Sequence, residues 1–251
     1  MGKIGGSKSL KRMPAPDDWP ISKKGFKWVV KSKAGPHSLE QSLPLLIILR
    51  DVLHLAKTRK EAQLILFEKN VKIDGKVKTD DDYPVGLMDV IEIPGINETY
   101  RLLPIHNRGL SLHAITGDEK EFKLCKIMNK TTVNGGDLQL NLHDGRNILM
   151  KTTDTIHNGE KIYATLDLLK VKLPTSEILG HLKFDEGVLV LVTAGKNTGR
   201  LGKVVKITKE SGSTQRTITL EDDEANKFET ISDYVFPVGK GEPWISIPKD
   251  D

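Results

Sequence analysis

The clearest hydrophobic pattern of the chain lies in residues 58–78, where a helical period is followed by a strand period. Ala62, Ile65 and Leu66 recur at the spacing of one helix face, which predicts an amphipathic helix. The residues that follow alternate between apolar side chains and lysines, as in a hairpin with one buried face. We therefore expect a compact helix–hairpin unit.

Both ends of this helix carry capping residues. Thr58 and Glu61 have the spacing of a capping box, which satisfies two backbone amides at the start of a helix. Asn70 stands where the helix must stop, and Asn tolerates the left-handed conformation that is common there. We expect the helix to begin after Thr58 and Asn70 to adopt that conformation.

The register of the hairpin depends on its loop. A three-residue loop at 74–76 would pair Ile73 with Val77 and leave Lys72 and Lys78 together on the exposed face. A two-residue loop would place a lysine opposite Ile73. We therefore expect the longer loop.

The middle of the chain reads as β-structure. An apolar helix is expected from Pro44 to near Leu55, and strands at 90–93 and 100–103 would close a first domain near residue 105. Further strands are expected at 110–115, 123–128, 138–142, 148–151, 161–165 and 168–173. Glycine-containing turns separate the first five of these strands, and the spacing of all six predicts a small barrel or sandwich.

A glycine-rich loop at 195–203 lies between two valine-rich strands, 188–192 and 204–207. Its glycines permit positive φ angles and close backbone approach, while its cations project outward. A phosphate-binding P-loop is excluded because Gly202-Lys203 is followed by Val204 rather than Ser or Thr. A purely structural turn with incidental cations stays open as an alternative.

Charge is distributed unevenly along the chain. The net charge is +4, yet residues 1–33 hold nine cations against two acids, and residues 217–251 hold nine acids against three bases. A basic N-terminal arm with few apolar anchors is expected to become ordered on a polyanion, although a merely solvating tail is the alternative. Trp19, Phe26 and Trp28 favour a partner, because they can stack or pack on it.

Composition narrows the class of protein further. The single cysteine, Cys125, allows no internal disulfide and no thiolate metal site, so we expect a reducing cytoplasm. No signal peptide is visible, and the apolar run 43–49 is too short to span a bilayer. The seven histidines show no metal-binding spacing, so we expect no catalytic residue, no metal and no cofactor.

The cations of these elements are the candidate RNA contacts. Arg59 and Lys60 stand at a helix N-terminus, where the dipole disfavours cations by about 0.3–1 kcal/mol each, which indicates an external anion. The full candidate set is Lys3, Lys8, Lys11, Arg12, Lys57, Arg59, Lys60, Lys69, Lys72, Lys76, Lys78, Lys196, Arg200 and Lys203. These side chains would bind phosphates of a folded RNA.

Two segments resemble known RNA-binding motifs. Arg59, Ala62, Leu64, Ile65, Val71, Ile73 and Gly75 match the S-four RNA-binding module, and 187–207 resembles the KOW motif. Over nearly its full length the chain resembles the e-type family of small-subunit ribosomal protein four, found in archaea and eukaryotes. The matching stretches are 11–19, 35–37, 72–77, 83–90, 123–126, 143–144, 195–202 and 239–248. The acidic end at Asp251 favours the archaeal branch.

The resemblance implies an α+β multidomain fold. It would comprise a basic N-terminal arm (1–42), a small helix-hairpin S-four-like RNA-binding domain (43–105), a central β domain (106–175) and a C-terminal SH3-like KOW β-barrel with its tail (176–251). It also implies a structural constituent of the small ribosomal subunit, in the cytoplasm, with small-subunit rRNA and neighbouring ribosomal proteins as partners.

Two other classes of protein stay open. S-four-like modules also occur in RNA-modifying enzymes and synthetases, but no stretch here offers a catalytic domain. A non-ribosomal RNA-binding assembly or elongation factor is the second alternative. Neither a membrane nor a small-molecule substrate is expected as a partner.

Overall fold

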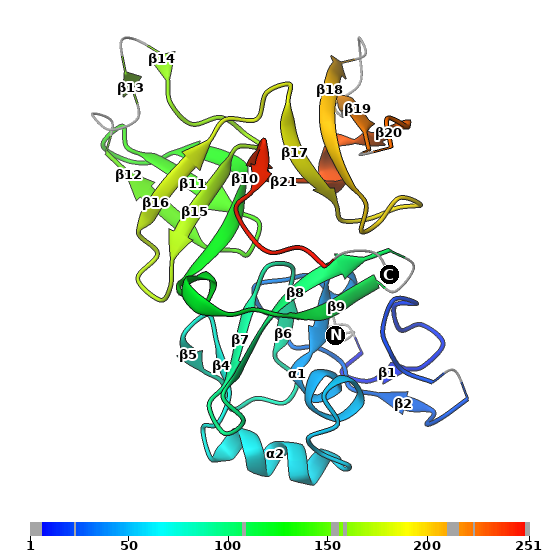
Figure 1. Ribbon diagram of the computed structural model, residues 1–251. Helices are drawn as coiled ribbons and strands as arrows, with labels where there is room; N and C mark the ends of the chain where they lie inside the picture. Colours follow the sequence, from blue (N-terminus) through cyan, green and yellow to red (C-terminus); the bar gives the residue numbers. More distant parts are fainter. Residues whose placement is uncertain are drawn as a thin grey trace, which may run out of the picture.

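The protein is mostly β-structure with few helices, as a computed structural model shows (Figure 1). The structure describes residues 7–22, 24–106, 109–151, 156–157, 160–209, 216–222 and 224–248. Three larger sheets, of five, five and six strands, make up the body of the molecule. None of the described helices is long and apolar enough to cross a membrane.

The first sheet has the strand order β5-β4-β7-β8-β9 and carries the helices on one side (Figure 1). Its strands are β4 (Lys72–Ile73), β5 (Lys76–Val77), β7 (Val90–Ile93), β8 (Glu98–Ile105) and β9 (Gly109–Ala114). The helices are α1 (Leu45–Ile47), which continues into a π-helical turn η2 (Ile48–Val52), and α2 (Arg59–Phe67). Two small sheets join this unit: β1 (Leu10–Lys11) with β2 (Trp28–Val29), and β3 (Ser42–Pro44) with β6 (Pro84–Gly86); a 3-10 turn, η1 (Leu39–Gln41), precedes β3.

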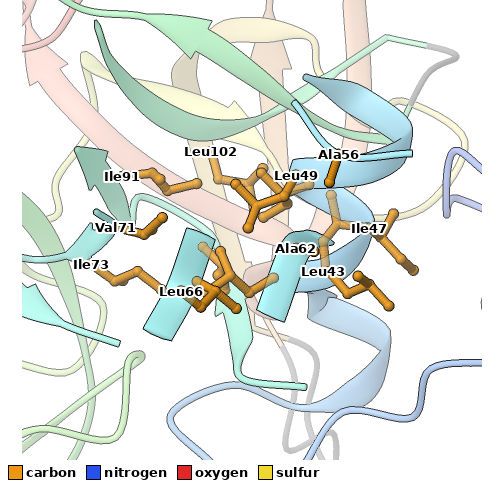
Figure 2. Close-up of a cluster of buried hydrophobic side chains, with 14 of the residues drawn as sticks. Leu43, Ile47, Leu49, Ala56, Ala62, Leu66, Val71, Ile73, Ile91 and Leu102 are labelled. Atoms are coloured by element: carbon orange, nitrogen blue, oxygen red, sulfur yellow. The ribbon is translucent and has the colours of Figure 1, made fainter. Parts of the chain in front are cut away.

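The core of this unit lies between the helices and the first sheet (Figure 2). Ala62 and Leu66 of α2 point towards Val71, Ile73 and Ile91, and all five are at most 2% exposed. Leu10, Ala15 and Trp19 of the N-terminal segment belong to the same buried cluster. The sequence predicts that this segment becomes ordered on a polyanion, but these three residues are held by the core of the chain itself.

The second sheet has the order β12-β11-β10-β15-β16. Its strands are β10 (Phe122–Thr132), β11 (Leu138–Leu142), β12 (Asn147–Met150), β15 (Leu168–Lys172) and β16 (Ile178–Leu182). A 3-10 turn, η3 (Gly117–Glu121), precedes it, and β13 (Ile156–His157) pairs with β14 (Glu160–Lys161). The strand expected at 161–165 is wrong, because only Lys161 lies in a strand there.

The third sheet has the order β20-β19-β18-β17-β21-β22. Its strands are β17 (Val188–Val192), β18 (Leu201–Lys209), β19 (Arg216–Glu221), β20 (Lys227–Ile231), β21 (Val235–Lys240) and β22 (Glu242–Pro243), with a 3-10 turn, η4 (Ser232–Tyr234), before β21. Bulges interrupt the pairing of β17 with β21 and of β18 with β19, and such bulges bend strands.

A shared apolar cluster holds the three sheets together. Leu103 from β8, Phe122 from β10, Leu191 from β17 and Phe236 from β21 are packed in it, with Ile245 from the C-terminal segment. After β22 the chain returns to the first unit, where Ser246 Oγ lies 3.1 Å from His113 Nε2.

Two local expectations are wrong in an informative way. The hairpin pairs Ile73 with Lys76, so its loop is the two-residue Asp74-Gly75, with φ angles of 50° and 74°. These left-handed angles are typical of a type I′ turn, whose twist matches that of the strands. The left-handed residue at the end of α2 is Lys69, with φ of 60°, and not Asn70.

Candidate nucleic-acid interface

The start of α2 holds its cations in place by capping. Thr58 Oγ1 accepts a hydrogen bond from Glu61 N at 3.3 Å, and the Glu61 carboxylate accepts one from Lys57 N at 2.8 Å. The capping pair is confirmed, although the carboxylate reaches the amide of Lys57 rather than that of Thr58. The side chains of Lys57 and Lys60 are exposed beside this first turn.

Arg59 has a partner within the chain. Its Nε and Nη2 lie 2.5 and 3.2 Å from the two carboxylate oxygens of Asp81, which is buried. This hydrogen-bonded pair raises the pKa of Arg59, against the smaller effect of desolvation. The argument that a cation at this helix end requires an external anion is therefore wrong for Arg59, since Asp81 supplies the negative charge.

The lysines of the hairpin lie on both of its faces; Lys76 is exposed, and Lys72 and Lys78 are half-buried. Because Lys72 pairs with Val77, the next residue, Lys78, lies on the opposite face, together with Lys76. The expectation that Lys72 and Lys78 share a face is thus wrong, for the same reason as the loop. Lys78 Nζ lies 4.3 Å from the ring centroid of Tyr83. Lys76, Lys78 and Tyr83 line a cavity of about 350 Å³ that reaches Arg146 of the second sheet.

The N-terminal cations differ in their surroundings. Lys8 and Lys11 are exposed, as is Lys69 at the end of α2, whereas Lys3 lies outside the described residues. Arg12 is 9% exposed and donates to the carbonyls of Ile21 and Ser22, at 2.9 and 3.3 Å. Arg12 therefore stabilises the N-terminal segment, and its role as an RNA contact stays a prediction.

A groove of about 870 Å³ lies between this segment and the start of α2. One wall carries Phe26 and Trp28, which are 84% and 54% exposed. The other wall carries Arg50, His54, Lys57 and Arg59. Both aromatic residues stand out in the sequence because they lie among Lys24, Lys27 and Lys31, but no local pattern places them beside the cations of α2.

The loop at 195–203 lies apart from α2, towards the third sheet (Figure 1). Lys196 and Lys203 are exposed, while the Arg200 guanidinium lies 5.6 Å from the ring centroid of Phe228. Gly199 has φ of 85°, and a Cβ there would stand 2.2 Å from the backbone nitrogen of His106. The loop is thus packed against the end of β8, which requires a glycine, and the structure does not bring its cations together with those of α2.

A buried ionic network joins the first and second sheets. Lys123, which is fully buried, donates to Asp89 and to Asp74, the latter at 3.0 Å, and its Nζ lies 3.1 Å from Asp144. Arg146 pairs with Asp74 and Asp144. The turn residue Asp74 thus has a tertiary role: its carboxylate binds two cations of the second sheet and accepts from Val90 N at 3.0 Å.

The charges of this network determine its protonation. Desolvation would raise the pKa of Asp144, but Lys123, His143 and Arg146 outweigh it and lower that pKa to about 2. Desolvation and the Lys123 charge lower the pKa of His143 to about 3. The neutral imidazole also fits its contacts, because Nδ1 accepts from Lys126 N at 3.3 Å and Nε2 faces the carbonyl of Leu87 at 3.2 Å.

Beside this network, the ligand atoms of Cys125, His143 and Asp144 lie within 4.8 Å of one another, close enough for a metal ion. Two features argue against a metal there. The Lys123 ammonium already supplies the cation beside Asp144, and burial raises the pKa of the Cys125 thiol, which keeps it protonated. The residues do not fit a metal site.

Comparison with known proteins gives matches along the chain. Residues 4–40 match the RS4NT (NUC023) domain, 43–91 the S4 domain, and 96–178 the ribosomal family S4e. The chain is 49% identical to small ribosomal subunit protein eS4 of Desulfurococcus amylolyticus and 49% identical to that of Staphylothermus marinus, each over 99% of both chains.

A solved structure agrees with these matches. The crystal structure of 30S ribosomal protein S4e from Thermoplasma acidophilum has a TM-score of 0.66 and 34% sequence identity, covering 80% of this chain and 96% of that one. The family expected from the sequence is thus confirmed. The chain belongs to the eS4 family of small ribosomal subunit proteins.

Proposed function

We propose that this protein is a structural constituent of the small ribosomal subunit that binds rRNA through its phosphate backbone and shape. The observation that carries the proposal is the exposed cationic surface of the helix–hairpin unit, in which Lys57, Lys60 and Lys76 project from two adjoining elements. This unit coincides with the part of the chain that matches the S4 domain. Family membership supports a non-catalytic role in the cytoplasmic ribosome, with rRNA and ribosomal proteins as partners.

Recognition by shape follows from the geometry of RNA. The deep, narrow major groove of A-form RNA prevents side chains from reading the bases of a duplex. Lysines on a rigid helix–hairpin can instead bind phosphates at fixed separations. Each such contact releases counterions, so the affinity must fall steeply as salt rises.

The third sheet supplies a second cationic element. We infer that 187–207 is a KOW-type strand–loop–strand in an SH3-like barrel, with Lys196 and Lys203 as its RNA contacts. The bulged strands and the positive φ of Gly195 and Gly199 support this assignment. The domain boundaries near residues 42, 105 and 175 stay predictions. The shared apolar cluster joins the three sheets that these domains would contain.

The test of the proposal is binding to rRNA under varied salt. The full-length protein is titrated with labelled small-subunit rRNA and, as a control, with large-subunit rRNA, from about 50 to 200 mM salt. We expect tighter binding to the small-subunit RNA, and a loss of roughly 10³-fold across this range if about six phosphates are bound. Equal affinity for both RNAs, or no salt dependence, would contradict the proposal.

A transient assembly or elongation factor would bind the same kind of RNA. Sedimentation of small subunits in high salt separates the two functions, because a stoichiometric constituent stays with the particle whereas a transient factor is washed off. Family membership favours the constituent.

A further inference from the structure

The groove between the N-terminal segment and α2 has features of a site for unpaired nucleotides. Its volume of about 870 Å³ lies within the usual range for ligand pockets, about 300–1,000 Å³, and leaves room for more than a single base. A duplex has no unstacked base to place there, whereas a bulge or a single strand has.

The aromatic wall is suited to stacking. Phe26 and Trp28 expose most of their surface, whereas Trp19 of the same segment is 3% exposed. Exposure of two large aromatic side chains to water is unfavourable, because their apolar surface is hydrated. An RNA base that stacks on these rings would remove that surface from water. This wall is also held in place, because Trp19 Nε1 donates to Ser42 O at 2.9 Å and Arg12 binds the carbonyls of Ile21 and Ser22.

The charges around the groove favour RNA over an apolar protein partner. The described lining residues include four cationic side chains and one carboxylate, Asp51. Arg50 pairs with Asp51 at 2.8 Å, and Arg12 and Arg59 also have partners within the chain, whereas Lys57 projects into solvent. Lys11 and Lys27 place their ammonium groups 5.7 and 5.6 Å from the centroid of the Trp28 ring. Lysine is depleted at protein–protein interfaces, whereas aromatic residues combined with lysines are typical of single-stranded nucleic-acid sites.

We propose that this groove binds an unpaired segment of RNA, with a base stacked on Trp28 or Phe26 and its phosphates near Lys11, Lys27 and Lys57. This site rests on the proposed rRNA-binding function and gives it a second recognition mode. The helix–hairpin unit binds phosphates of folded RNA, and the groove selects a place where the RNA is unstacked.

The test compares single-stranded and duplex RNA. Full-length protein is titrated with a labelled heptauridine and with a blunt duplex of the same length, and binding is followed by fluorescence anisotropy. Trp28→Ala is expected to weaken heptauridine binding by roughly 5- to 150-fold, the loss of one stacked base, with little change for the duplex. Trp28→Phe keeps a ring and should retain most of the affinity, and Phe26→Ala should also weaken heptauridine binding.

Phe67→Ala is the matched control, since Phe67 is 79% exposed on α2 and lies outside the groove. The site is overturned if wild-type protein does not bind heptauridine, or if Trp28→Ala and Phe26→Ala bind it no more weakly than Phe67→Ala. A groove variant that weakens association with ribosomal proteins and leaves heptauridine binding unchanged would also overturn it, by assigning the groove to a protein. None of these results touches the proposed function, which fails only if binding to small-subunit rRNA itself fails.

Discussion

Lysines serve two opposite purposes in this molecule, and the difference lies in their surroundings. Lys123 is buried against three carboxylates that come from both joined sheets. Lys57, Lys60 and Lys76 stand in solvent on short, rigid elements. The first kind must be paired for the chain to fold, whereas the second kind is left exposed where an anion can bind. Charge alone therefore does not identify an RNA contact; the partner and the burial of each cation do.

The largest effect is expected when the buried lysine is removed. Lys123→Met leaves three buried carboxylates with Arg146 beside Asp74 and Asp144 and His37 beside Asp89, and breaking such a network costs about 3–5 kcal/mol. The free energy of unfolding, measured by urea denaturation, should fall by that amount. Lys172→Met, at an exposed position of β15, is the control and should change it by less than about 0.5 kcal/mol. Equal stability of the two variants would remove the distinction between the two kinds of lysine.

Acid should lower the free energy of unfolding through His143, which lies beside the same ionic network. The folded pKa of His143, about 3, lies below its unfolded value near 6.5, so the unfolded chain binds a proton that the folded chain does not. The contribution of His143 to the free energy of unfolding is therefore fully present above pH 6.5. It falls by about 1.4 kcal/mol per pH unit as the pH drops towards 3. His143→Gln should reduce this slope between pH 6 and 4.5. An unchanged slope would show that His143 is protonated in the folded protein.

Removal of exposed cations should affect binding and not folding. In the double variant Lys60→Gln/Lys76→Gln, the free energy of unfolding should change by less than about 0.5 kcal/mol. Affinity for small-subunit rRNA should fall, and the slope of log affinity against log salt should decrease by roughly 0.7–0.9 for each lost phosphate contact. A loss of stability comparable with that of Lys123→Met would mean that these lysines are structural.

Arg59 lies between the two kinds, and its removal should have only a small effect on folding. Its side chain is 54% exposed although its partner Asp81 is buried. Exposed ion pairs contribute about 0–1 kcal/mol, so Arg59→Ala should lower the free energy of unfolding by no more than that. The Arg59→Ala/Lys60→Ala double variant should still flatten the salt dependence of rRNA binding, mainly through Lys60. An unchanged slope would exclude Lys60 as a contact.

The sequence was informative wherever local chemistry decides the structure. The capping pair Thr58–Glu61 and the amphipathic face of α2 follow from spacing alone, and both are present. The hairpin register was predicted wrongly although Asp74-Gly75 is a local signal for a two-residue type I′ loop, because the pairing of apolar side chains favoured a longer loop. The tertiary role of Asp74 could not be predicted from the sequence. Its carboxylate binds Lys123 and Arg146, which lie 49 and 72 residues further along the chain.

The same limit applies to the candidate site. The sequence identifies cations but not their partners, so Arg12 and Arg59 were grouped with lysines such as Lys57 and Lys60, whose exposed ammonium groups have no hydrogen-bonded carboxylate or carbonyl partner among the described residues. Arg12 binds carbonyls of its own segment, and Arg59 binds a carboxylate 22 residues away. The groove was missed for a related reason: its aromatic wall and its cationic wall come from segments about 30 residues apart. In the loop 195–203 the sequence did predict positive φ angles at glycines, and Gly195 and Gly199 have φ of 86° and 85°.

The return of the chain after β22 has a consequence for biosynthesis. Ile245 packs in the cluster that contains Leu103 of β8 and Phe122 of β10, and Ser246 N donates to Glu119 at 3.0 Å. Residues 245 and 246 are translated more than 120 positions after those partners. While the protein is being made, the surface that Ile245 and Ser246 cover therefore stays open until translation has passed residue 246, so the early sheets cannot reach their final packing before then.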